Sequence, residues 1–494
     1  MTPPADRTLH IELRRGAYRD SVRLMQISQA VNATPGVSAG LVAMATPLNL
    51  DLAANMGFSP PPDATANDML VALAADNDEA LRAALARLEA ELDAVDARPG
   101  AGDATTSVAP RTVGSAVRLL GANLTLVSTP GRYAFVDAMD ALDAGSSVMV
   151  FSDNVSVAEE IRLKDAATER GLLAMGPDCG TAVIGGVGLG FANVVRPGPV
   201  GIVAASGTGA QHMMSLLDAA GVGVSHVLGV GGRDLSAAVA GRATLAALDA
   251  LDADDTTELI VVISKPSAPE VAARVREHAD RLATPVVFAL LDAGQPDLTE
   301  VAAGVLRRIG APVPAPWPAW LPAASPVATG PAIRGLFSGG TLCYEAMLIA
   351  SDALGPVRSN TPLRPDWALP ADLRADGHLM IDFGDDTLTQ GRPHPMIDSA
   401  QRLERLGAEL ADPACGVVLM DVVLGHAAHP DPAAELAPAI AGAKVPVVVS
   451  LVGTAGDPQG LARQAGQLRD AGAAVYTSNA DATRRAIQLV AAGS

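Results

Sequence analysis

Hydrophobic residues in this chain occur in short continuous runs that alternate with stretches of helical periodicity. Runs such as "ELIVVISK" and "TPVVFALLDAG" are typical of strands buried on both faces of a parallel sheet. Between them lie amphipathic stretches with a period near 3.6, of which "NDEALRAALARLEAELDAV" is the longest example. The repeated alternation predicts an α/β protein.

The first 97 residues are predicted to form a small α/β domain. Its elements read as a strand "LHIELRRGAY", a helix "RDSVRLMQISQAVNAT", a strand "GVSAGLVAMAT", a strand "DMLVALAAD" and the amphipathic helix quoted above. The segment "DARPGAGDATTSVAPRT" follows, and its Gly, Pro, Ser and Thr residues favour neither helix nor strand. We therefore expect a domain at 1–97 and a linker after it.

A second domain is predicted at 113–197. Strand, helix, strand and helix patterns follow one another in "NLTLVST", "YAFVDAMDALDAG", "SVMVFSD" and "VAEEIRLKDAATERG". This order is half of a Rossmann-like sheet, but no G-x-G-x-x-G follows its first strand, so a dinucleotide site is weakly supported.

The rest of the chain reads as two versions of one α/β domain, at 198–310 and 333–494, joined by a Pro- and Ala-rich linker at 311–332. The order of elements is the same in both blocks. Matching positions are "SGT" at 206–208 with "SGGT" at 338–341, "GGRD" at 231–234 with "GDD" at 384–386, and "TPVVFALLDAG" with "VPVVVSLVGTAG". We infer an internal duplication.

Both blocks begin with a strand, a turn of small residues and a helix. The first N–H groups of a helix have no partner within the helix, and the helix dipole adds positive potential there, so such a turn suits a phosphate or carboxylate. The alternative is a plain N-cap by Ser206 or Thr208 in a tight turn. The same device in both blocks favours two helix ends that face one anion across a pseudo-twofold axis.

The composition of the chain argues against several classes of binding partner and site. The formal net charge is −19 and aromatic residues make up 3% of the chain, which argues against nucleic acid. The three cysteines are far apart and show no CxxC spacing, so neither disulfides nor a zinc cluster is indicated. No apolar run approaches the length of a membrane span or of a signal peptide core. We expect a soluble cytoplasmic protein without a membrane partner.

Several motifs in order resemble a known superfamily. "MGPDCGTAVI", "GPVGIVAASGTG" and "GVGGRDLS" resemble the α-subunit of succinyl-CoA synthetase and the NDP-forming acyl-CoA synthetases. Together with "FSGGTLCYEA", "GRPHPMID" and "GTAGDPQ", they resemble more narrowly the FdrA-type proteins of that superfamily. The resemblance spans about residues 16–490 and implies doubly wound parallel sheets: a Rossmann-like CoA-binding-type domain and two tandem flavodoxin-like domains of the succinyl-CoA synthetase type.

The resemblance also assigns site residues by position. The phosphate-binding residues would be Ser206, Gly207, Thr208, Gly209, Ser338, Gly339, Gly340 and Thr341. The CoA-contacting residues would be Ser152, Asp153, Asn154, Gly176 and Pro177, and Lys265, one of three lysines, is added as a cation at a strand end. CoA or a nucleotide is the cofactor implied. The alternative is that residues 152–156 form only a helix N-cap and that Lys265 is a strand-end lysine without a role in binding.

Three further side chains are candidates for catalysis. Glu345 matches the glutamate that follows the glycine turn in the ligases, and His212 holds that place in the first block. In the loop "DFGDDTLTQGRPHPMID", Arg392 suits a carboxylate or phosphate, and His394, with a pKa near neutrality, suits proton transfer. The competing interpretation is a solvated turn fixed by its prolines. His426 and His429 lack further ligands nearby, so we predict a surface loop there and no metal site.

One departure from the ligases bears on mechanism. The ligases carry phosphate on a histidine, whereas the corresponding segments here, "DAGQPDLTEVAAGVL" and "GTAGDPQGLARQAGQ", contain none. Without that carrier, an anion site suits direct attack on an acyl or carbamoyl phosphate. FdrA-type proteins imply a subunit of an oxamate carbamoyltransferase of allantoin catabolism, with carbamoyl phosphate and oxamate as substrates.

We accordingly expect a carbamoyl- or acyl-transfer enzyme with a small phosphorylated or carboxylate substrate, partner subunits and a homo-oligomeric state. Two alternatives stay open at this point: an NDP-forming acyl-CoA ligase, and a non-catalytic CoA-binding scaffold. The acceptor, the oligomeric state and the identity of the partner subunits do not follow from the residues.

Overall fold

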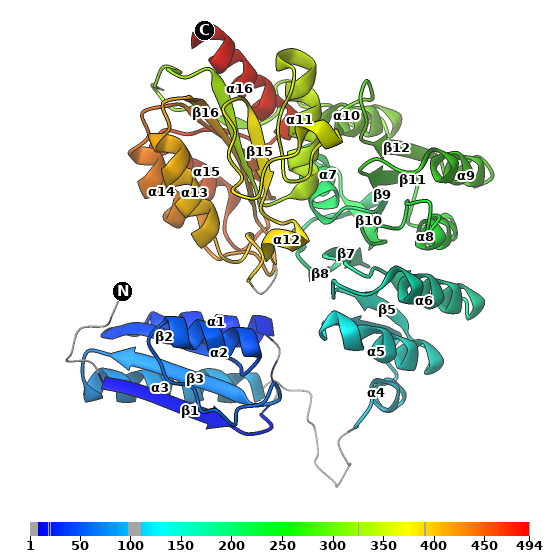
Figure 1. The fold of residues 1–494 in the computed structure, drawn as a ribbon. Helices are drawn as coiled ribbons and strands as arrows, with labels where there is room; N and C mark the ends of the chain where they lie inside the picture. Colours follow the sequence, from blue (N-terminus) through cyan, green and yellow to red (C-terminus); the bar gives the residue numbers. More distant parts are fainter. Residues whose placement is uncertain are drawn as a thin grey trace. The chain divides into compact units, whose positions relative to one another are not determined.

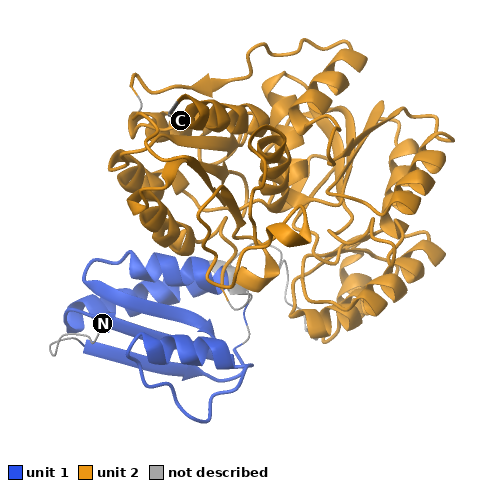
Figure 2. Cartoon of the chain, turned by 45° about the horizontal axis from the view of Figure 1, so that its top comes forward, with its two compact units in different colours: residues 1–109 blue, residues 110–494 orange. Residues whose placement is uncertain are grey.

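The structure is a computed structural model that describes residues 8–17, 19, 21–96, 110–324, 326–389 and 392–493. Figure 2 shows the chain as two compact units, residues 1–109 and 110–494. Residues 97–109 of the predicted linker lie outside the described residues.

The N-terminal unit is a three-stranded antiparallel sheet with helices on both faces. In chain order its elements are β1 (Thr8–Arg14), α1 (Ser21–Asn32), β2 (Val37–Met44), α2 (Pro47–Asn55), β3 (Met69–Ala75) and α3 (Asp78–Asp96). The strand order is β1-β3-β2, and the central strand β3 is buried along its whole length. Side chains of α1 and α3 pack on one face of β3 and those of α2 on the other.

The larger unit starts with the predicted Rossmann-like strands and continues into the first repeated block. Its elements up to residue 308 are α4 (Val113–Leu120), β4 (Leu124–Val127), α5 (Gly131–Asp143), β5 (Ser147–Val150), α6 (Val157–Glu169), β6 (Ala174–Met175), β7 (Thr181–Ile184), β8 (Val187–Gly190), β9 (Pro197–Ala204), α7 (Gly207–Ala219), β10 (Val224–Gly229), α8 (Arg242–Asp252), β11 (Leu259–Ser264), α9 (Pro269–Ala279), β12 (Val286–Leu290) and α10 (Leu298–Arg308).

The second block follows. Its elements are β13 (Ala319–Trp320), β14 (Ala332–Phe337), α11 (Gly340–Leu354), a short 3₁₀ turn (Pro365–Trp367), β15 (Leu379–Asp382), α12 (Asp386–Thr389), α13 (Ala400–Ala411), β16 (Cys415–Val423), α14 (Pro432–Ala441), β17 (Val447–Val452), α15 (Leu461–Asp470), β18 (Ala474–Tyr476) and α16 (Asn479–Gly493).

The two repeated blocks have the same sheet topology. The first sheet contains β12-β11-β9-β10 and the second β17-β16-β14-β15, so the four successive strands of each block occupy the same places. All of these neighbours pair in parallel. With β18 added, the second sheet has the doubly wound order 2-1-3-4-5, in which ligands bind beyond the carboxyl ends of the strands. This is the fold class that the sequence predicted.

The strand order does not agree with the domain boundary predicted at residue 197. The Rossmann-like sheet contains only β4, β5 and β6, whereas the hairpin of β7 and β8 extends the sheet of the first block. Val183 of β7 pairs with Val227 of β10 in antiparallel orientation. A boundary at residue 197 therefore divides a continuous sheet, because long-range strand pairing leaves no mark in the local pattern.

The linker predicted at 311–332 is not a simple spacer. Trp317 is buried in the core of the first block, and β13 pairs antiparallel with β18 at the edge of the second sheet. The Thr477 N–H donates to the Pro318 carbonyl oxygen. The segment is thus bound to both blocks, although Ser325 lies outside the described residues.

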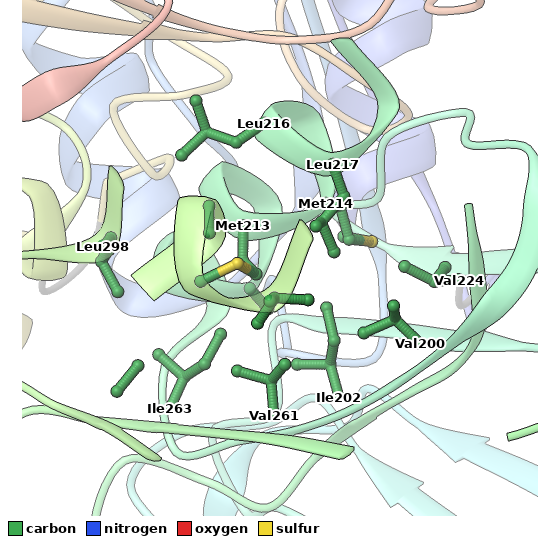
Figure 3. Close-up of a cluster of buried hydrophobic side chains, with 14 of the residues drawn as sticks. Val200, Ile202, Met213, Met214, Leu216, Leu217, Val224, Val261, Ile263 and Leu298 are labelled. Atoms are coloured by element: carbon green, nitrogen blue, oxygen red, sulfur yellow. The ribbon is translucent and has the colours of Figure 1, made fainter. Parts of the chain in front are cut away.

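Helices α7 and α11 lie between the two six-stranded sheets (Figure 1). Every residue of α7 from Gly209 to Asp218 is buried, as expected of a helix covered on all sides. Figure 3 shows methionines and leucines of α7 over the valines and isoleucines of β9 and β11. Tyr344 and Leu348 of α11 pack against the same cluster. This helix layer fixes where the two glycine turns meet.

Candidate functional site

The first glycine turn leaves backbone donors open. Strand β9 ends at Ala204, and Ser206 is the N-cap of α7, with its Oγ accepting from the Gly209 N–H at 2.8 Å. The N–H groups of Gly207 and Thr208 have no acceptor among the described residues. The end of α7 therefore keeps two backbone donors for an anion, and the phosphate site at this turn stays a prediction.

The second glycine turn is already filled by a side chain of the protein. The N–H groups of Ser338 and Gly339 each donate to the Asp421 carboxylate at 2.7 Å, and Ser338 Oγ donates at 2.9 Å. Asp421 lies near the carboxyl end of β16, fully buried, and pairs with Arg402 of α13 at 2.9 Å. The predicted second phosphate-binding turn must be corrected, because Ser338 and Gly339 hold an internal carboxylate and only Gly340 and Thr341 remain at that helix end.

The two turns contact each other directly. Ser206 Oγ and Thr341 Oγ1 are 2.5 Å apart. A Cβ on Gly209 would lie 3.1 Å from the Thr341 methyl group, and one on Gly339 would lie 2.9 Å from the Thr208 methyl group. These two glycines thus permit the close, pseudo-symmetric approach of the helix ends that the duplication suggested.

A carboxylate and a lysine flank this meeting point. Asp382 ends β15 and is buried; its Oδ1 accepts from the Gly384 N–H at 3.0 Å, and its Oδ2 lies 2.5 Å from where a Cβ on Gly340 would stand. Burial raises the pKa of Asp382 to about 7, against the opposing charge of Lys265. Lys265 follows β11 and makes neither a hydrogen bond nor an ion pair with any described residue. An available cation therefore lies at the carboxyl end of the strand next to β9.

The loop after β15 differs from expectation at its histidine. Burial lowers the pKa of His394 to about 4, so the ring is neutral near pH 7. His394 Nδ1 accepts from the Met396 N–H at 3.2 Å, which leaves the proton on Nε2. The expected pKa near neutrality was therefore wrong, because the ring is packed beside Phe191 at 5.4 Å between centroids. Arg392 is exposed, and its neighbours Gln390 and Gly391 lie outside the described residues.

Glu345 lies inside the helix layer, away from solvent. Its carboxylate accepts from the Leu298 N–H at the start of α10 and from Asn479 Nδ2 at the start of α16, both at 2.7 Å. Burial raises the pKa of Glu345 to about 7. His212 lies nearby, where its Nε2 accepts from the Asn479 N–H at 3.5 Å, and burial lowers its pKa to about 3. The geometry gives Glu345 a role in joining helices rather than the catalytic one predicted from the resemblance.

The predicted CoA-contacting residues lie on two loops beyond β5 and β6. Ser152 is buried and its Oγ donates to the Thr129 carbonyl oxygen at 2.5 Å, whereas Asp153 and Asn154 are exposed. The second loop is close to the first block: a Cβ on Gly231 would lie 2.3 Å from the Pro177 carbonyl oxygen.

The second of these loops packs against β5, and the first lies near the loop after β15. Gly176 has a φ of +91° and lies against the Val150 carbonyl oxygen, so only glycine fits there. Burial and the charges of Asp153 and Asp385 raise the pKa of Asp386, which places the loop of Asp153 near that of Asp386. Loops of three sheets therefore converge here, and they carry several carboxylates with Lys265 and Arg233 as nearby cations.

The turn "GTAGDPQ", which the resemblance aligns with the ligase histidine loop, is hydrogen-bonded to the segment before β9. The Asp457 carboxylate accepts from the N–H groups of Val194 and Thr454, both at 2.7 Å, and from Asn193 Nδ2 at 2.8 Å. Thr454 Oγ1 donates to the Val194 carbonyl oxygen at 2.5 Å. The side chains of Asp457 and Thr454 are buried. A carboxylate thus binds this turn to the segment before β9.

Sequence reasoning missed Asp421, Arg402 and Asp457. Asp421 interrupts the apolar run "CGVVLMDVVLG", and a single acid in a strand buried on both faces is a signal for a buried polar contact. Its partners lie on other elements, so their identity required the structure.

The comparisons with known proteins agree with the fold. Residues 336–489 match the CoA-ligase family, and residues 6–108 match the AllF heavy metal-associated domain. The uncharacterized protein YahF of Escherichia coli strain K12 is 37% identical over 525 aligned positions, covering 98% of this chain and 99% of YahF. The succinate–CoA ligase [ADP-forming] subunit alpha 2 of Archaeoglobus fulgidus is 30% identical and covers 35% of this chain and 61% of that subunit.

Among solved structures, the dinucleotide-forming acetyl-coenzyme A synthetase 1 of Candidatus Korarchaeum cryptofilum, in complex with phosphate and ADP, is 17% identical. The likeness has a TM-score of 0.31 and covers 80% of this chain and 88% of that one.

In the described residues of the region that matches the heavy metal-associated domain, no cluster of three or more metal-ligating side chains occurs. All three cysteines lie beyond residue 109. No group of three or more His, Cys, Asp or Glu side chains suited to a metal ion occurs in the described part of the chain. Among the same residues, none of the helices has the length and apolar character needed to cross a bilayer.

Proposed function

We propose, for a chain that belongs to the same family as YahF and carries a CoA-ligase domain, that it transfers a carbamoyl or acyl group directly from a phosphorylated donor. The donor would be carbamoyl phosphate and the acceptor oxamate, as the FdrA-type resemblance implies, and partner subunits would complete the enzyme. The observation that carries the proposal is the turn at Asp457, which holds no histidine and is closed on Val194, beside an open helix end at α7.

The open helix end suits the phosphate of such a donor. The N–H groups of Gly207 and Thr208 would bind phosphate oxygens, and the Lys265 ammonium would balance their charge. The acceptor nitrogen would attack the carbonyl carbon, the C–O bond to phosphate would break, and the leaving phosphate would stay on the same donors. No phosphorylated side chain is required, which agrees with the missing histidine.

CoA or a nucleotide has no step in this proposal. Gly131 and Gly176 permit close packing of these loops within the protein, because a Cβ at either would meet a backbone oxygen. The exposed carboxylate of Asp153 there opposes a diphosphate, whereas burial raises the pKa of Asp178 to about 7, and Lys265 and Arg233 are nearby cations. If CoA binds at these loops, it supplies an acyl acceptor thiol.

Thermal unfolding with four separate ligands tests the proposal: carbamoyl phosphate, oxamate, CoA and ADP. We expect carbamoyl phosphate to raise the melting temperature of the wild type and of Lys444→Met, an exposed control, but not of Lys265→Met. Phosphate release with oxamate and the candidate partner subunits should follow the same pattern.

Two other results contradict the proposal. Stabilisation by CoA and ADP without any by carbamoyl phosphate indicates an acyl-CoA ligase. No stabilisation by any of the four indicates a scaffold without catalytic function.

A further inference from the structure

The Asp382 carboxylate is hydrogen-bonded to the protein through only one of its two oxygens among the described residues. It lies at the carboxyl end of β15, and 4% of its surface is exposed. One oxygen accepts from the Gly384 N–H, and the other has no hydrogen-bond partner among the described residues. The hydrogen bonds of the protein therefore leave one carboxylate oxygen of Asp382 available to a ligand.

A capping role does not explain Asp382. Helix α11 starts beside it, but the turn before α11 is already satisfied by Asp421, which accepts from both Ser338 and Gly339. Asp382 Oδ2 instead lies against Gly340, the neighbour of Thr341, whose hydroxyl contacts Ser206 of the first turn. The free oxygen therefore faces the point where the two helix ends meet.

We propose that Asp382 is the proton-transfer group of the reaction, an inference that rests on the proposed function. As the acceptor nitrogen bonds to the carbonyl carbon of the donor, the proton that the nitrogen loses passes to Asp382 Oδ2. The C–O bond to phosphate then breaks, Asp382 returns the proton to the departing oxygen, and hydrogen phosphate leaves. Atoms and charge balance, and Asp382 ends the cycle as it began.

The surroundings of Asp382 suit this role. Burial, together with Asp385 on the same loop and Asp421 on β16, raises its pKa, while Lys265 after β11 lowers it, with a result of about 7. Two further titratable groups lie near it. Cys343 of α11 remains a neutral thiol because burial raises its pKa well above the ordinary value. His394 Nε2 lies 3.0 Å from where a Cβ on Gly384 would stand, and burial lowers the pKa of that ring to about 4. A carboxyl that titrates near neutral pH can both accept and return a proton.

The test compares Asp382→Asn with Asp385→Asn, a neighbouring aspartate whose carboxylate accepts from the Thr387 N–H at the start of α12. We expect Asp382→Asn to keep the thermal shift with carbamoyl phosphate and to lose the transfer rate by about 100-fold or more. Asp385→Asn should keep the thermal shift and the rate at high pH, and it should move the rise of the rate to lower pH, because the charge of Asp385 helps to raise the pKa of Asp382. The wild-type rate should rise with pH through about 7 and then level, and this rise should be absent in Asp382→Asn.

The outcomes separate the two proposals. If the wild type binds and transfers but Asp382→Asn keeps its rate and its pH profile, the role of Asp382 is refuted and the proposed function stands. If the wild type shows neither a thermal shift with carbamoyl phosphate nor phosphate release, both fail. If Asp382→Asn does not fold, a wild-type rate that is level between about pH 5 and pH 9 refutes the role of Asp382.

Discussion

Replacing Asp421 by alanine should destabilise the second block and create a new anion site at the start of α11. The carboxylate accepts from Ser338 N, Ser338 Oγ, Gly339 N and Arg402 in a fully buried position. Its removal leaves a buried guanidinium without its counter-charge and two backbone N–H groups without acceptors. The loss of one partner from a buried ion pair costs about 3–5 kcal/mol.

That cost sets the expected shift in melting temperature. For a block of this size, each kcal/mol corresponds to about 2–4 °C, so Asp421→Ala should melt about 10 °C lower in scanning calorimetry. Asp470→Ala removes an exposed partner of Arg469 and serves as the control, with a shift near zero. The double variant Asp421→Ala with Arg402→Met should recover part of the lost stability, because no buried guanidinium is then left without a counter-charge.

Added inorganic phosphate shows whether Asp421→Ala is destabilised by the loss of a carboxylate at the α11 turn or by a non-specific disturbance of the fold. The helix end vacated by Asp421 should bind phosphate, and at ten times the dissociation constant this gives about 1.4 kcal/mol of stabilisation to the variant. The wild type gains nothing at this turn because its own carboxylate fills it. If Asp421→Ala melts within about 2 °C of the wild type, or if phosphate raises its melting temperature no more than that of the wild type, the assigned role of Asp421 is wrong.

Two further predictions concern Glu345 and Asp457. Burial raises the folded pKa of Glu345 to about 7 from 4.5, so its contribution to stability is fully present below about pH 4.5 and is lost as the pH rises through 7. Melting curves from pH 4.5 to 8 should show this decline. Glu345→Gln should remove part of it, since the pKa values of Asp382 and Asp178 are also raised to about 7; an unchanged slope would contradict the assignment. Asp457→Ala leaves three donors without an acceptor, which should cost about 3 kcal/mol and increase hydrogen exchange at the Val194 N–H, whereas unaltered protection of that amide would show that Asp457 does not hold the turn.

Local pattern was sufficient to predict the fold class and the duplication. Apolar runs and turn residues lie in the same order in both blocks, and the strand orders β10-β9-β11-β12 and β15-β14-β16-β17 confirm that class. The helix α2 was missed, although Thr46 and Pro47 carry an N-cap signal, because its apolar pattern is short. A pairing between strands far apart in the sequence, such as β7 with β10, leaves no periodic pattern. The segment of β7 was therefore assigned to the Rossmann-like sheet, whereas it belongs to the sheet of the first block.

The candidate site was predictable only in part, for a related reason. Turn residues show where a helix begins, and both glycine turns lie where the sequence indicated. Which turn is open depends on Asp421, a residue about 80 positions away whose partner Arg402 lies on another helix. The pKa of His394 also depends on burial that the loop sequence does not reveal.

The strand pairing of β13 has a mechanical consequence. One short segment anchors a tryptophan in the first core and adds a strand to the far edge of the second sheet. A relative displacement of the two blocks would therefore have to break the pairing of β13 with β18 or pull Trp317 out of the first core.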